Sequence, residues 1–189
     1  ILNSQTYQLS SVGGSEDPKA AANFAAYPLR RLEAEVLIDA LCQVTGSTEK
    51  YTSAIPEPFT FVPEAHRSIA LPDGSISSSF LELFGRPARD TGLEAERNNR
   101  PTAAQRLHLL NSSHIQRKIE QSRIVQNLSQ SKTPPREMIA GLYLATLSRF
   151  PTESEAKLAS APFETRGVSR RETACDLVWA LVNSPEFCC

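Results

Sequence analysis

The chain has 189 residues, of which 40% are hydrophobic, enough for one sizeable core in one domain or at most two, with one as the simpler interpretation. It carries 20 Lys+Arg against 21 Asp+Glu, so its formal net charge is -1 and no overall positive field draws it to nucleic acid or anionic membrane. No apolar run approaches the ~20 residues of a membrane-spanning helix. We therefore expect no nucleic-acid partner and no membrane insertion.

The two ends of the sequence predict a fragment of a longer, multidomain protein. It begins at Ile1 without the charged-then-apolar order of a signal peptide, and it stops at Cys189. We therefore expect any targeting signal to lie outside it. The four cysteines fit neither a zinc pattern nor haem attachment, so we expect no metal and no cofactor within the chain. Cys42 and Cys175 fall on apolar faces of predicted helices, where a buried free thiol is the ordinary interpretation.

A first helix is predicted over residues 28–46, after a polar entry segment over residues 1–27. Its apolar residues repeat at helical spacing, and the run ends at Gly46, a residue that readily adopts the left-handed conformation of a helix end. The apolar positions are Leu29, Leu32, Val36, Leu37, Ala40, Leu41 and Val44. The opposite face carries Arg31, Glu35, Asp39 and Gln43. We interpret this face as solvated, although Arg31 and Glu35 are spaced so that they can pair.

An irregular layer is predicted over residues 47–101. Six of the 13 prolines fall there, and no helical period persists. We expect at most short strands in it, with 59–62 and 68–71 as the best candidates. Residues 80–84 could form a turn of helix before Gly85.

The region 102–187 is predicted to be helical. In a capping box, a Ser or Thr side chain and a Glu or Gln three residues later satisfy free backbone donors at a helix start. A fourth helix is expected to start at Thr133-Pro134, a further helix covers roughly 115–128, and the short loops favour antiparallel neighbours. The predicted fold is a single, mainly α, antiparallel helical domain that carries the irregular layer. The three capping-box pairs are Thr102 with Gln105, Thr152 with Glu155, and Ser169 with Glu172.

Four sequence blocks, taken together in this order, carry a family resemblance. They are YPLRRLEAEVLIDALCQVTG, FLELFGRPARDTGLEAERNNRPTAAQRLHLLNSSHI, IAGLYLATLSRFPTESE and DLVWALVNSPEF. The ordered set resembles the planctomycete-specific domain of unknown function that lies C-terminal to cytochrome-c-like domains in planctomycete and verrucomicrobial proteins. The resemblance implies a periplasmic or other extracytoplasmic setting, companion domains of the same polypeptide as partners, and haem in an attached upstream module. It implies no established activity.

One departure from that family narrows the chemistry. Many relatives place two cysteines in an ACECER-like run, whereas this chain has Gly92-Leu93-Glu94-Ala95-Glu96-Arg97. A redox or thiolate-metal role for those cysteines is therefore absent here. The acidic pair and the arginine that follows it remain.

These charged residues form the candidate polar site. If the run is extended, Glu94 and Glu96 lie on the same side, where two carboxylates could bind a hard cation or share a proton. The alternative is structural: the arginines at 86, 89, 97 and 100 pair with the carboxylates at 90, 94 and 96 and hold an irregular loop together. The full candidate site is Arg89, Asp90, Glu94, Glu96, Arg97 and Asn111.

Other polar and aromatic residues have two interpretations each. Arg166, Arg170 and Arg171 are a candidate contact for phosphates or acidic glycans, and an internal carboxylate is the commoner partner. His108 and His114 are six apart, which points them to different faces of a helix, and we expect packed or surface histidines. Trp179 forms either a second buried face or a contact for a neighbouring domain.

The absence of a nucleophile elbow or a metal signature favours a non-catalytic function. We expect an interaction or scaffold domain of a larger extracytoplasmic, cytochrome-associated protein, which is not an enzyme by itself. The alternative is part of an enzyme site, carbohydrate-related or redox, that upstream domains complete and to which Glu94, Glu96 and Arg97 contribute.

Overall fold

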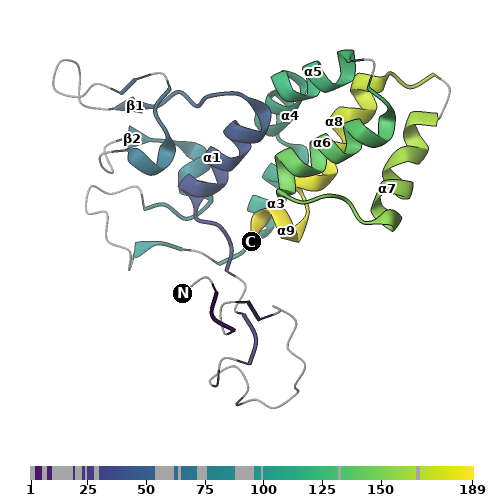
Figure 1. Cartoon of the computed structure of the whole chain (residues 1–189). Helices are drawn as coiled ribbons and strands as arrows, with labels where there is room; N and C mark the ends of the chain where they lie inside the picture. Colours follow the sequence, from purple (N-terminus) through teal and green to yellow (C-terminus); the bar gives the residue numbers. More distant parts are fainter. Residues whose placement is uncertain are drawn as a thin grey trace. The chain divides into compact units, whose positions relative to one another are not determined.

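The chain divides into two compact units in the computed structural model (Figure 1). Ile1–Arg31 with Cys189 form the first, and its described residues include turns closed by backbone bonds from Gln8 to Ser4 and from Asn23 to Lys19. Leu32–Cys188 form the second unit, which contains the helices and strands. The structure describes residues 3–5, 8–9, 19, 23, 25–27, 30–53, 62–63, 65–71, 76–87, 96–98, 100–131, 133–164 and 167–189.

Helix α1 (Ala34–Thr45) opens the second unit. It ends as predicted at Gly46, where φ is 65° and the glycine N–H donates to the carbonyl groups of Cys42 and Gln43. Its start lies later than the expected residue 28, because Glu33 is extended and the Leu32 N–H donates to the Cys188 carbonyl at 2.9 Å. The entry to α1 is thus held by the C-terminal end of the same unit.

Among its described residues, the irregular layer contains two short strands, β1 (Thr52–Ser53) and β2 (Ile76–Ser77), which pair antiparallel. The strand expected at 68–71 is wrong: 3₁₀ helix η1 (Ser68–Ala70) lies there, and the Asp39 carboxylate of α1 accepts the N–H groups of Ser68 and Ile69. The candidate strand at 59–62 falls outside the described residues except for Val62. The turn of helix expected at 80–84 is confirmed as α2 (Ser79–Leu83).

The region after residue 101 is helical, as predicted. The capping boxes at Thr102 and Thr152 are both formed, and the Ser169 hydroxyl accepts the Glu172 N–H. The helix expected over 115–128 is two helices, because the buried Ser122 hydroxyl accepts the Val125 N–H and starts a new one. In chain order the elements are α3 (Ala103–Asn111), α4 (Ser113–Glu120), α5 (Arg123–Gln130), α6 (Pro135–Leu147), α7 (Glu153–Ser160), η3 (Ala161–Glu164), α8 (Arg170–Val182) and α9 (Pro185–Cys188).

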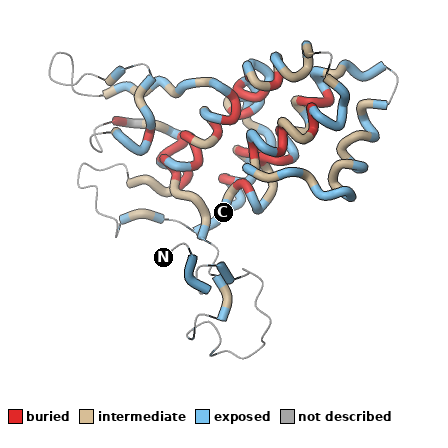
Figure 2. Tube along the Cα trace, viewed as in Figure 1, coloured by how far each residue is buried: buried red, intermediate tan, exposed pale blue. Residues whose placement is uncertain are grey.

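The core of the second unit lies between α1 and the C-terminal helices. Figure 2 shows buried positions gathered along α1, α6 and α8. Leu37 and Leu41 of α1 belong to the same cluster as Met138 of α6 and Val178 of α8. Burying each such side chain contributes roughly 1.5 to 3 kcal/mol, so this cluster is the main term that holds the helices together. The expected mainly α fold is confirmed.

Candidate functional site

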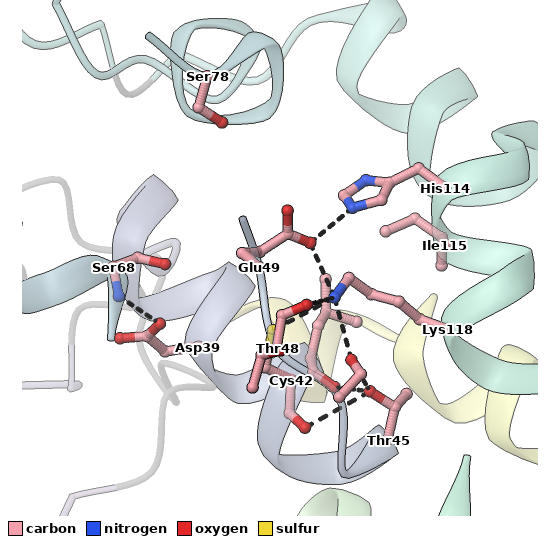
Figure 3. Close-up of polar contacts among 12 residues, drawn as sticks. Asp39, Cys42, Thr45, Thr48, Glu49, Ser68, Ser78, His114, Ile115 and Lys118 are labelled. Atoms are coloured by element: carbon pink, nitrogen blue, oxygen red, sulfur yellow. Dashed lines mark hydrogen bonds and ion pairs between the residues drawn. The ribbon is translucent and has the colours of Figure 1, made fainter. Parts of the chain in front are cut away.

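A buried lysine of α4 lies at the centre of a polar cluster in the second unit (Figure 3). Lys118 is 7% exposed, and its Nζ lies 2.7 Å from Oε1 of Glu49. The same ammonium donates to the Ser47 hydroxyl at 3.0 Å, to Cys42 Sγ at 3.3 Å and to the Thr48 carbonyl at 3.4 Å. A buried charge is tolerated when it is paired and hydrogen-bonded, and Lys118 meets both conditions.

The local sequence explains why these groups meet. Ile115 and Ile119 are buried, so helical spacing also turns Lys118 toward the core from α4. Gly46 ends α1 in a left-handed conformation, and residues 47–49, which follow it, contact Lys118 of α4. The Thr45 hydroxyl donates to the Leu41 carbonyl at 2.7 Å and supports that turn.

Two histidines extend the cluster away from the lysine. Nε2 of His114 lies 2.7 Å from Glu49 Oε1, and Nδ1 of His114 lies 3.5 Å from Nε2 of His108. The ring of Phe80 contacts both imidazoles edge to face, with centroid separations of 5.6 and 5.8 Å. The expectation that His108 and His114 point to different faces is wrong, because the chain breaks at Ser112 and places them on α3 and α4.

The electrostatics of the cluster stabilise charge but activate no nucleophile. Burial alone would raise the pKa of Glu49, but hydrogen bonds from His114 and Lys118 outweigh it and hold the pKa below 4.5. Burial raises the pKa of Cys42 above 9.0 despite the neighbouring Lys118. Since the thiolate is the nucleophile, Cys42 is a protonated and unreactive thiol at neutral pH.

A cavity of about 210 Å³ borders the cluster, between α1 and the irregular layer. Ligand pockets are usually ~300 to 1,000 Å³, so this one is small. Both carboxylates that border it are engaged, Glu49 with Lys118 and Asp39 with the η1 amides at 2.7 and 3.1 Å. Among the residues that the structure describes, no group of three His, Cys, Asp or Glu side chains is arranged to hold a metal ion. The cavity lining is Asp39, Cys42, Gln43, Ser47, Thr48, Glu49, Ala65, His66, Arg67 and Ser68.

A second charged cluster contains part of the predicted polar site. Nη1 and Nη2 of Arg97 each donate at 2.8 Å to a different oxygen of Glu35, a bidentate pair. Arg86 approaches the same carboxylate at 3.4 Å, and Glu33 lies 3.6 Å from Arg97. Burial would raise the pKa of Glu35, but Arg97 and Arg86 hold it below 4.5. The prediction that Glu35 and Asp39 lie on a solvated face is wrong: they are 4% and 9% exposed.

Of the remaining predicted site residues, the structure describes Glu96 and Asn111. Arg89, Asp90 and Glu94 lie outside the described residues. Glu96 precedes Arg97 and is exposed, and Asn111 is exposed at the end of α3. Arg97 therefore bonds to α1, whereas the structural interpretation had expected partners within its own loop.

The candidate anion contact consists, where described, of arginines that hold helix ends. Arg166 lies outside the described residues. The Nη2 group of Arg170 donates to the Thr133 carbonyl just before α6. That of Arg171 donates to the Glu120 carbonyl at the end of α4, at 2.6 Å. Their observed partners are backbone carbonyl groups beside helix ends, where the expected internal partner was a carboxylate.

A surface groove lies between α3, α4 and α8 on the second unit, with a volume of about 340 Å³. Trp179 of α8 lines it and donates its indole N–H to the Leu110 carbonyl of α3 at 3.1 Å. The indole is nevertheless 39% exposed, beside Leu110 at 41% and, one turn earlier on α3, Leu107 at 58%. The groove lining is Leu110, Gln116, Ile119, Glu120, Cys175, Asp176 and Trp179.

The sequence did not single out Glu35, Asp39, Glu49 and Lys118 as a site. Glu49 and Lys118 belong to no recognised motif. Glu35 and Asp39 lie four residues apart on the face of the first helix that we had interpreted as polar and solvated. The irregular layer predicted beside α1 was the one signal that this face could be covered. Across the described ranges, no helix combines the length and apolarity that crossing a membrane requires.

Comparison with known proteins adds the family. The family model PSD1, described as a protein of unknown function (DUF1553), matches residues 1–162, a segment that contains both charged clusters. No curated protein and no solved structure matches the chain. Because the matched segment covers most of the sequence, the chain belongs to the PSD1 family of proteins of unknown function (DUF1553).

Proposed function

We propose that this chain is a non-catalytic interaction domain of a larger protein, and that it binds a companion domain of the same polypeptide. One observation carries the proposal: Leu107, Leu110 and Trp179 form an exposed apolar strip on α3 and α8, which we call the α3–α8 strip. Single exposed apolar residues are ordinary, whereas adjacent ones around a tryptophan are typical of binding surfaces. By family resemblance, the proposed setting is extracytoplasmic and cytochrome-associated.

The way in which the charged residues of the two clusters are bonded supports this role. Glu35 is paired with Arg97, Asp39 holds η1, and Glu49 is paired with Lys118. Each pair joins α1, or the turn that follows it, to a segment distant in sequence. Such pairs rigidify a scaffold and leave none of these groups free to transfer protons to a substrate.

The same contacts give less support to an enzyme site built on Glu94, Glu96 and Arg97. Both terminal nitrogens of Arg97 are already bonded to a buried carboxylate. Moving Arg97 to a substrate would leave Glu35 buried and short of its bidentate partner, which is costly. We therefore propose the interaction role ahead of the catalytic one.

The single tryptophan of the chain makes the proposal directly testable. The chain is titrated with the flanking segments of its own polypeptide by calorimetry, while Trp179 fluorescence is recorded. We expect association together with a blue shift, because a partner on the α3–α8 strip removes water from the indole. The absence of both signals for every flanking segment would overturn the proposal.

A pair of matched variants locates the surface. Leu107→Ser removes an apolar contact from the strip and should weaken binding about tenfold, since 1.4 kcal/mol corresponds to a factor of ten. Leu158→Ser on α7 is the control, because that side chain is 76% exposed and lies outside the strip. Equal weakening by both variants would place the binding surface elsewhere, and melting temperatures confirm that each variant is folded.

A further inference from the structure

The groove beside Trp179 combines apolar and acidic residues in a defined arrangement. The buried Ile119 and the half-buried Cys175 line it together with Leu110 and Trp179. Its charged lining residues are both acidic and exposed, Glu120 of α4 and Asp176 of α8. At about 340 Å³ it falls within the usual range of ligand pockets, ~300 to 1,000 Å³.

Two of the groups that a ligand would meet are held by bonds within the protein. The indole N–H of Trp179 is held by the Leu110 carbonyl, which fixes the ring. Asp176 lies three residues earlier on α8, so its carboxylate emerges on the same helical face as the indole. On α4, the Gln116 amide donates to Glu120 Oε1 at 3.0 Å. A ligand would therefore lose little free energy in ordering the indole.

The charge around the groove is negative. Glu172 lies four residues before Asp176 on α8, and it acts on the Cys175 thiol together with Glu120 and Asp176. Arg171 is a basic residue that acts on the same thiol, and its guanidinium is bonded to the Glu120 carbonyl. Burial is the main cause that raises the pKa of Cys175, and the three carboxylates add to it. Glu120 and Asp176, the charged residues that line the groove, are both carboxylates, which favours a cation at this place.

We propose that this groove takes a lysine or arginine side chain presented by a protein segment of the partner, with the aliphatic stem on Ile119 and Leu110 and the charge between Asp176 and Glu120. Long basic side chains bury an apolar stem and keep the charged head in water, which matches the apolar lining and acidic edge. The indole face of Trp179 adds a cation–π attraction. The inference rests on the proposed interaction function and names its partner chemistry.

Short peptides test the chemistry without knowledge of the natural partner. The probe is acetyl-Gly-Leu-Arg-Leu-Gly-amide, titrated into the full 189-residue chain while Trp179 fluorescence is recorded. The control peptide replaces arginine with citrulline, which keeps the shape of the side chain and removes its charge. We expect the arginine peptide to bind at least tenfold more tightly than the citrulline peptide and to weaken as salt is added. Equal binding of the two peptides would overturn the proposal.

Variants of the protein test the residues. Asp176→Asn removes one carboxylate of the groove and should weaken binding of the arginine peptide about fivefold. The control is Glu137→Gln, an exposed carboxylate on α6 that does not line the groove. An unchanged affinity in Asp176→Asn would overturn the assignment, and so would equal losses in both variants.

The same proteins separate this inference from the proposed function. If Leu107→Ser weakens binding of the companion domain while Asp176→Asn does not, the interaction role holds and the assignment of a basic side chain to the groove is wrong. If the arginine peptide binds selectively but no flanking segment does, the groove chemistry holds and the companion-domain role is wrong. Analytical ultracentrifugation tests whether a second copy of the chain occupies the surface instead. If the chain forms a dimer that Leu107→Ser dissociates and Asp176→Asn leaves intact, the surface belongs to a second copy and the proposal is overturned.

Discussion

Arg97 donates two parallel hydrogen bonds of 2.8 Å to the Glu35 carboxylate, which lies 62 positions earlier in the chain. The carboxylate belongs to the first turn of α1 and is 4% exposed, so the pair fixes the segment around residue 97 against the core. The neighbouring Asn98 donates its N–H to the Gly85 carbonyl at 3.1 Å, just after α2. Two adjacent residues thus attach the last part of the irregular layer to two helices.

The first prediction concerns the bidentate geometry of this pair. Arg97→Lys keeps the charge but offers a single ammonium, so one oxygen of the buried Glu35 loses its partner. We expect a loss of about 1 to 3 kcal/mol in the free energy of unfolding, measured by urea denaturation. Arg136→Lys is the control, because its pair with Glu153 is exposed and should contribute less than about 1 kcal/mol. Equal stability of wild type and Arg97→Lys would contradict the structural role.

The second prediction concerns the buried Lys118. In Glu49→Gln the lysine stays buried without its carboxylate, which should cost about 3 to 5 kcal/mol because a buried charge is left uncompensated. In Lys118→Met the half-buried Glu49 carboxylate loses its ammonium but keeps His114 as a partner, so this change should cost less. The double variant Glu49→Gln/Lys118→Met removes both charges and should cost clearly less than the sum, as a double-mutant cycle measures. Additive losses would mean that the two groups do not interact.

The third prediction uses two glycines with similar backbone angles. Gly85 has φ of 105° and Gly167 has φ of 98°, conformations that favour glycine. A Cβ at Gly85 would collide with the Asn98 carbonyl group, with the carbonyl carbon at 2.8 Å, whereas a Cβ at Gly167 meets no atom of the described residues within 4 Å. Gly167→Ala should therefore cost about 1 to 2 kcal/mol from strain alone. Gly85→Ala should cost a further 1 to 3 kcal/mol or so, measured by denaturation, because the backbone must also move.

The fourth prediction is a loss of stability in acid that proceeds in two windows. Burial and the neighbouring His114 lower the pKa of His108 from 6.5, so the unfolded chain takes up this proton first and stability falls as the pH drops below about 6.5. The pKa values of Glu35 and Glu49 lie below 4.5 in the folded chain, so their contribution is complete above pH 4.5 and is lost below it.

His108→Gln separates the two windows, because glutamine does not titrate. The variant should lose the dependence of its melting temperature on pH between about 6.5 and 5 and keep the fall below pH 4.5. His66→Gln is the matched control, because His66 lies outside the His108–His114 pair and is bonded to the Ala70 carbonyl at 2.7 Å. An equal change in both variants would mean that the effect is not specific to His108. A wild-type melting temperature that is constant between pH 7 and 5 would contradict the assignment to His108.

Local signals located most of the helices. The Thr102 and Thr152 capping boxes form as the sequence predicts, because a hydroxyl and a side chain three residues later satisfy backbone donors without outside help. Gly46 ends α1 for an equally local reason. The prediction of a strand at 68–71 was wrong because the structure of this segment depends on a distant residue. The Asp39 carboxylate of α1 accepts two of its backbone N–H groups and favours a 3₁₀ turn.

The candidate site was predicted less well than the fold. Arg97 was singled out from the sequence, but its partner Glu35 was assigned to a solvated face. The histidine–glutamate–lysine cluster joins Glu49 to His114 and Lys118, which lie 65 or more positions later in the chain, so no spacing rule could connect them. The α3–α8 strip was anticipated only in Trp179, for which a contact with a neighbouring domain was one of two interpretations.

By itself the sequence determined the helical class, the starts of several helices, the irregular layer after α1 and the family to which the chain belongs. These depend on capping, turn and apolar patterns that act over a few residues, and on the order of the blocks along the chain. The tertiary structure alone decided which charges are buried, which arginine meets which carboxylate, and where apolar side chains remain exposed. Those outcomes depend on burial, because a charge removed from water is stable only beside a partner, and that partner can come from anywhere in the chain.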